Sequence, residues 1–234
     1  GIVNIYKKEV SEGRLRIDGC VITYIMYTAN ENGKNTVRSI NHTIDFSQII
    51  AIENATSEMI ENTKVLLQSI KCQIINERKI NIKVNMNFDV KLFTSSNIEY
   101  VNNVKLDDIQ KLEKKFTINN VLGMASTKAS ISEKVAIDNT NNLAEILKTN
   151  VNIMNVETKI SVNKILIKAD INFKMLYSNE EGKVFQVKRV FPVMGFVDMQ
   201  DIKEDAICDP NIEIRNMLVK PNGSEDKTVS VDME

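Results

Sequence analysis

The sequence is short of the residues from which most binding and catalytic sites are built. Among its 234 residues there is no tryptophan, one histidine and three cysteines. Three scattered cysteines are too few for a disulfide framework or a zinc cluster. We therefore expect Cys20, Cys72 and Cys208 to be reduced structural thiols in a cytosolic setting, with cross-linking between subunits as the alternative.

Charge excess and long apolar runs are also missing. Thirty basic residues are balanced by 31 acidic ones, and a net charge of −1 lacks the basic excess that nucleic-acid binding requires. No apolar run approaches the roughly 18 residues of a membrane helix, so no membrane span is predicted. The start, Gly1-Ile2-Val3, is not that of a signal peptide, and without a Met it leaves room for a removed upstream segment.

Motifs for catalysis are absent as well. The single histidine, His42, lies in an alternating strand pattern with no nucleophile elbow nearby, which favours an exposed strand residue. The eight glycines form no phosphate-binding loop. Pairs of acidic residues fall in predicted turns, where solvated charge is the simpler explanation. These pairs are Glu180 with Glu181, Glu204 with Asp205, and Glu225 with Asp226.

The sequence therefore predicts a non-enzyme with no cofactor, no metal and no identifiable binding residue. Two alternative functions stay open. One is an enzyme with an unrecognised carboxylate site, and the other is a carbohydrate- or peptidoglycan-binding module. The latter needs aromatic platforms, and only 6% of the residues are aromatic. Tyr24, on the polar face of its segment, is a weak candidate for such stacking.

Alternation of apolar and polar residues is what the sequence has in abundance. In Lys79–Phe93 an apolar residue stands at every second position, and Arg14–Thr28 and Lys164–Ser178 carry related patterns. A period of two is typical of β-strands with one covered face. The chain is 43% hydrophobic, enough to bury sizeable cores, and its length favours two modest domains. The predicted fold class is mainly β and antiparallel.

Two of these segments align with each other at an offset of 150 residues, which pairs Arg14 with Lys164 and Tyr27 with Tyr177. Each is followed by an acidic turn with a glycine, Gly33 or Gly182, for which we predict a positive φ. An internal duplication is the simplest explanation. We expect two tandem β-sandwich-like repeats with short helices at the junction.

The expected boundaries are a first repeat at 1–103, a linker helix at 104–116, and a second repeat at 117–234. Within the second repeat, Asn141–Thr149 is predicted to form a short helix that Asn142 caps, with Glu145 three residues later. A strand-like stretch, Gly123–Ile137, precedes this helix and has no counterpart before the first repeat.

Alignment of the two repeats predicts that the first is incomplete at its beginning and that the other is shortened at its end. Units of this kind would complete each other between molecules by strand addition, which predicts self-association into head-to-tail polymers. A chain cut at convenient boundaries is the simpler alternative.

Two stretches, Asn141–Tyr177 and Ile75–Phe93, resemble the SPOCS domain of clostridial sporulation proteins. In that family a short acidic helix leads into a strand, a tight turn and a long alternating strand that ends near a tyrosine. The stretch Ile75–Phe93 is similar to the domain's closing hairpin. Taken as two copies, the likeness covers nearly the whole chain.

The resemblance implies a non-enzymatic structural or scaffold role in the bacterial spore envelope, in the coat, the exosporium or an appendage. It also implies other spore-coat morphogenetic proteins as partners, including the coat-basement ATPase to which the best-known member binds. The implied location is the mother-cell cytoplasm and then the spore surface layers. That member usually ends in a peptidoglycan-binding LysM module, of which this sequence shows no sign.

Overall fold

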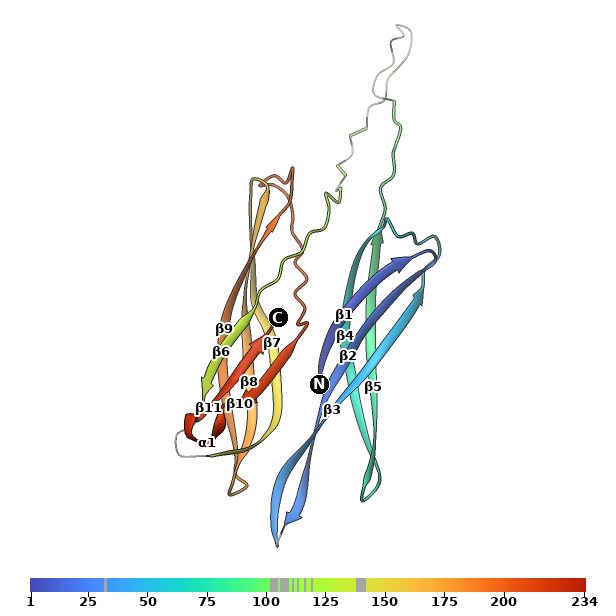
Figure 1. Cartoon of the computed structure of the whole chain (residues 1–234). Coiled ribbons are helices and arrows are strands. Elements are labelled where there is room, and N and C mark those ends of the chain that lie inside the picture. The colour runs from blue at the N-terminus through green and yellow to red at the C-terminus, as the bar shows by residue number, and fades with distance from the viewer. Residues whose placement is uncertain are drawn as a thin grey trace.

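The computed structural model describes residues 1–31, 33–101, 105, 110, 112, 114–115, 117–118, 120–137 and 142–234, without the side chains of Glu31, Ser224 and Glu225. As predicted, the described chain is mainly β, and its strands pair antiparallel (Figure 1). In chain order the elements are β1 (Ile2–Ser11), β2 (Arg14–Glu31), β3 (Lys34–Ala51), β4 (Ile60–Asn76), β5 (Lys79–Phe93), β6 (Ile131–Ala136), β7 (Leu143–Ser161), β8 (Lys164–Asn179), β9 (Val184–Asp198), β10 (Met217–Pro221), α1 (Gly223–Asp226) and β11 (Thr228–Met233).

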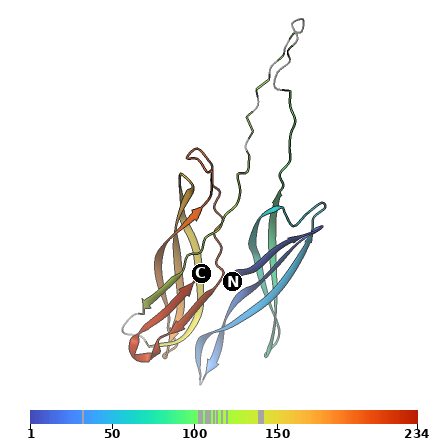
Figure 2. The same ribbon diagram turned by 45° about the horizontal axis from the view of Figure 1, so that its top comes forward.

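The strands form two elongated bodies that lie side by side in both ribbon views (Figures 1 and 2). We call β1–β5 the first half and β6–β11 the second half. The first half packs the sheet β1-β2-β3 against the hairpin β4-β5, and the second half packs β7-β8-β9 against the sheet β10-β11-β6. Each half is therefore a two-layered sandwich with its core between the layers.

The three-stranded sheets of the two halves follow the same plan. In the first half Val10 pairs with Leu15, and in the second half Ile160 pairs with Ile165, so the pairing repeats at the offset of 150 residues. The turns that join these strands have a positive φ at the same place, at Gly13 (φ 72°) and at Asn163 (φ 57°). Glycine and asparagine are the residues that adopt this backbone region most readily. Leu15 and Ile165 are both buried on the central strand of their sheet.

The cores of the halves differ in how well the opposing sheet closes them. In the second half the inward side chains of β11, Val229, Val231 and Met233, are buried. The corresponding side chains of β5, from Ile80 to Leu92, are all only partly buried. The alternating segment Lys79–Phe93 thus forms the expected strand, β5, but its apolar face is incompletely covered.

Both turn glycines have the predicted positive φ, 79° at Gly33 and 81° at Gly182. The strands that follow them are long, because β3 continues to Ala51 and β9 to Asp198.

The predicted helix at Asn141–Thr149 is wrong, because β7 already begins at Leu143 and pairs with β8. The register of this pair shifts between Leu143 and Glu145 and again between Ile146 and Lys148. Extra residues at such bulges break the period of two and give the apolar residues a helix-like spacing. The predicted linker helix at 104–116 falls largely outside the residues that the structure describes.

A matched pair of substitutions tests the difference between the two cores. Val231→Ala removes a fully buried side chain and is expected to lower the free energy of unfolding by about 2 kcal/mol. Val90→Ala, at a partly exposed position of β5, is expected to cost less than about 1 kcal/mol. Urea denaturation, monitored by circular dichroism, gives the free energy of unfolding of both variants. Equal losses of stability in the two variants would contradict the difference in burial.

Candidate interaction surface

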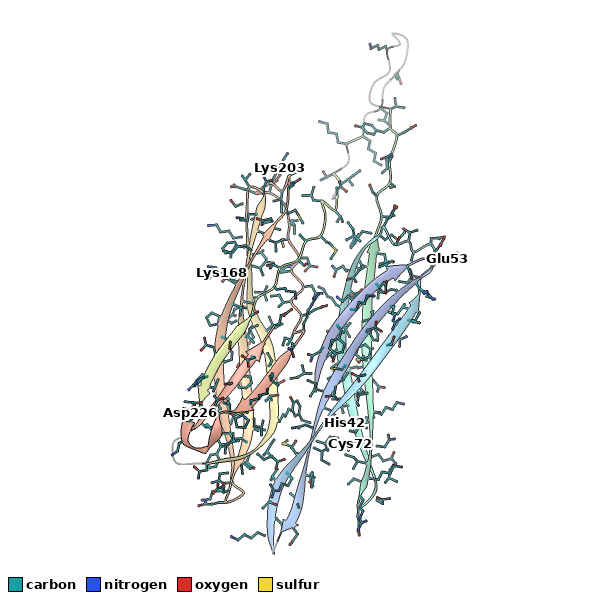
Figure 3. All side chains as sticks on the ribbon, viewed as in Figure 1. His42, Glu53, Cys72, Lys168, Lys203 and Asp226 are labelled. Carbon is teal, nitrogen blue, oxygen red and sulfur yellow. The ribbon has the colours of Figure 1, made fainter. Side chains whose placement is uncertain are left out.

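The residues that the sequence singled out as chemically notable lie apart from one another on the surface of the described chain. His42 is exposed on β3 (Figure 3), and no three His, Cys, Asp or Glu side chains in the described ranges group as metal ligands. Glu181 lies in an exposed turn beside Lys183, whose ammonium is 2.9 Å from the carboxylate and lowers the pKa of Glu181. A carboxyl with a lowered pKa stays ionised, which is the opposite of what a general acid requires. Within the described chain, no helix is both long and apolar enough to span a membrane.

The three cysteines are free and lie in different surroundings. Cys20 is buried and accepts a 2.7 Å hydrogen bond from the Tyr6 hydroxyl, which raises the pKa of Tyr6 to about 12. Burial raises the pKa of the Cys208 thiol and keeps it protonated. Cys72 is exposed on β4 (Figure 3). Reduced thiols, and cross-linking as the alternative, both stay predictions.

Polar contacts join the two halves along β2, β3 and β7. The Tyr24 hydroxyl lies 2.6 Å from that of Thr149, and the Ser39 amide donates a 3.0 Å hydrogen bond to Glu145. The other carboxylate oxygen of Glu145 is 3.3 Å from the Arg38 guanidinium. Tyr24, which the sequence offered as a weak stacking candidate, is therefore engaged with the chain's own second half, and burial raises the pKa of its hydroxyl.

A further group of contacts centres on Lys8 of β1. Its ammonium is 2.6 Å from the carboxylate of Glu213 and donates a 2.9 Å hydrogen bond to the Thr63 carbonyl on β4. The side chains of Lys8 and Glu213 are only 14% and 24% exposed. Breaking a pair this well shielded leaves a partly desolvated charge without its partner. Both groups of contacts thus hold the halves together through side chains with defined partners.

Two grooves on the surface of the described chain differ in what already occupies them. One, of about 410 Å³, lies where the halves meet, and Tyr24, Asn41, Glu145 and Thr149 contribute to its wall. Three of these four side chains take part in the hydrogen bonds between the halves or in the ion pair. This groove is part of the internal joint.

The other groove, of about 620 Å³, opens on one side of the first half, between the end of β3 and β5. We call it the β5 groove. Its lining is mostly apolar and consists of Ile50, Ile52, Glu53, Asn54, Met59, Phe88, Asp89, Val90 and Leu92. Figure 3 shows Glu53 at the outer end of the first half, near the top of β5. No partner within the first half covers this side, because β5 pairs only with β4 among the described strands.

The second half shows what covers the same side there. β11 pairs with β10 on one edge and with β6 on the other, from Thr228 opposite Ala136 to Met233 opposite Ile131. β6 also contacts β9, so it closes the side of the sandwich between the two sheets. Among the described strands, none in the first half occupies the place that β6 has in the second half. The edge of β5 and the β5 groove are therefore uncovered.

Comparison with known proteins identifies the family. The family model of the SipL SPOCS domain matches residues 1–75 and 142–222, more than half of the chain. The chain belongs to the SipL SPOCS-domain family. The two matched segments cover β1 to nearly the end of β4, and β7 to β10, in line with the repeated sheet plan. No curated protein and no solved structure matches the SPOCS-family chain significantly.

Sequence reasoning named no residue of the β5 groove as a site. Phe88, Val90 and Leu92 had the pattern of a core face, which does not reveal that the face is left partly uncovered. The strand-like pattern of Gly123–Ile137 predicts β6 but does not show that β6 pairs with β11, so the open edge of β5 could not be read from it.

The contact between the halves is tested at Glu145. Glu145→Ala removes the acceptor of the Ser39 amide and the partner of Arg38, and is expected to lower the free energy of unfolding by about 1–2 kcal/mol. Faster hydrogen exchange at the Ser39 amide should accompany this loss. The control is Glu180→Ala, at an exposed turn residue, with an expected change within about 0.5 kcal/mol. Equal effects of the two changes would contradict a role of Glu145 in joining the halves.

Proposed function

We propose that this SPOCS-family chain is a non-enzymatic scaffold protein of the bacterial spore envelope that acts through protein–protein contacts. The family match carries the proposal, since it links both halves of the chain to a domain of sporulation proteins. The structure supports it with an open strand edge and an apolar groove, features by which sheet proteins bind other chains. Its units are proposed to be the repeats at 1–103 and 117–234.

The proposed partners are other coat morphogenetic proteins, with the coat-basement ATPase among them, and further copies of the chain joined by strand addition. The proposed place of action is the mother-cell cytoplasm and then the coat, exosporium or appendages of the spore. A carbohydrate- or peptidoglycan-binding role finds less support. The groove at β5 offers one aromatic side chain for stacking, Phe88, beside the polar Glu53, Asn54 and Asp89, and the groove at the joint holds Tyr24 in a contact with Thr149.

The proposal is tested by imaging a fluorescently tagged copy in sporulating cells. We expect the signal to encircle the forespore, because a scaffold of the envelope must collect on that surface. A tagged copy of an unrelated β-sandwich protein of similar size serves as the control. A diffuse signal in the mother cell throughout sporulation would contradict the proposal.

A binding assay with purified cell wall and cortex distinguishes the scaffold role from the carbohydrate- or peptidoglycan-binding role. A protein-interaction scaffold is expected to stay in the supernatant when these polymers are sedimented. Retention that soluble muropeptides abolish would favour the carbohydrate-binding role instead.

A further inference from the structure

The open edge of β5 has a sequence that fits a second copy of itself. β5 runs from Lys79 to Phe93, and Met86 is its middle residue. When two β5 strands lie antiparallel with Met86 opposite Met86 of the second copy, all 15 residues of each strand find a partner. Antiparallel addition is also the geometry by which β6 extends β11 in the second half.

In this register the charges on the exposed face of β5 are complementary. Lys83 lies opposite Asp89 of the second copy, and by symmetry the same pair forms twice. Both side chains are exposed, and within the hairpin Asp89 lies opposite Lys64 and Lys83 opposite Lys71 on β4. Opposite charges facing each other across a sheet stabilise the pair of strands, whereas like charges destabilise it.

Neighbouring registers lack this match. A shift of two residues in one direction places Lys79 opposite Lys91 of the second copy, and the same shift in the other direction places Lys83 opposite Lys91. Shifts by a single residue place the apolar face of one strand beside the polar face of the other. The register with the greatest overlap is therefore also the one that sets lysine against aspartate.

The apolar face of β5 is completed in the same arrangement. Phe88 lies opposite Val84 of the second copy, and Val90 lies opposite Ile82 of the second copy. Phe88 and Val90 line the β5 groove and are only partly buried in the single chain. Aliphatic side chains from the second copy would cover them, as β6 covers the side of β11 in the second half.

We propose that β5 is a homodimerisation edge, and that two copies join β5 to β5 in the Met86-centred antiparallel register to form one continuous sheet, β4-β5-β5-β4. The inference rests on the proposed scaffold function, for which it supplies the contact between copies. Such a contact is isologous and closes on itself, so it makes dimers. Growth into longer assemblies requires another contact elsewhere on the chain.

Cysteine cross-linking tests the register on the full chain. The background carries Cys72→Ser and Cys208→Ser and keeps the buried Cys20. In it, Met86→Cys brings two thiols face to face across the dyad, within the roughly 4.4–6.8 Å between Cα atoms that a disulfide needs. We expect a disulfide-linked dimer on a non-reducing gel after mild oxidation. The control, Asn81→Cys, lies opposite Lys91 of the second copy and is expected to stay monomeric on the gel.

A charge exchange tests the same contact in solution by sedimentation at several protein concentrations. Lys83→Asp sets aspartate against aspartate twice and is expected to weaken the dimer on the order of tenfold. Asp89→Lys sets lysine against lysine twice and is expected to weaken the dimer to the same extent. The double variant, Lys83→Asp with Asp89→Lys, restores both opposite pairs and should restore the dimer. Lys79→Asp is the matched control, because it makes the same change of charge opposite the uncharged Phe93 of the second copy.

Three results would overturn the proposal. The first is a chain that stays monomeric at all concentrations with no cross-link at position 86. The second is a dimer that does not obey the Met86-centred register, shown by equal cross-linking at Asn81→Cys or by single charge reversals without effect. The third is a monomer that binds a labelled peptide of residues 128–137, which contains β6, because β5 would then receive a foreign strand. Imaging around the forespore tests the scaffold function independently of the dimer. A monomeric chain that still encircles the forespore would refute the dimer but not the scaffold function.

Discussion

The structure depends on a central strand in each half that buries one face and pairs along both edges. β2 and β8 hold this place, with Leu15 and Ile17 buried on β2 and Phe173 and Met175 on β8. Because side chains alternate between the faces of a strand, a slip of one residue would expose the whole apolar set. The shared register of the two halves follows from this constraint, and so does the position of the strands that pair with β2 and β8.

The constraint explains why much of the fold was predictable from sequence and where prediction failed. Regular alternation predicted β2, β5 and β8, and the turn glycines were assigned the correct backbone region. The start of β7 was read as a helix because bulges interrupt its alternation, and a single sequence does not show that β8 pairs with it there. Pairing with a neighbour far along the chain outweighs local helix preference, which is worth only tenths of a kcal/mol per residue.

The candidate surface was much less predictable, because it is defined by what the fold leaves uncovered. The alternation of β5 shows that one face is apolar, but only the three-dimensional arrangement shows that Phe88 and Val90 lie beside an open side. The joint between the halves is equally hidden in the sequence. Glu145 and Ser39 are 106 residues apart, and an isolated charged residue in a strand carries no sign of its distant partner.

An open, alternating edge strand is a hazard as well as a binding surface, and β5 carries features that restrict what pairs with it. Lys79, Lys83 and Lys91 stand on its exposed face, and lysines on an edge strand oppose indiscriminate pairing with other sheets. Such charges cost little when the incoming strand offers an acidic residue in register, and they repel strands that offer basic ones. The residues that protect this edge in the single chain therefore also select its partner, which makes a specific contact at β5 compatible with an apolar groove open to water.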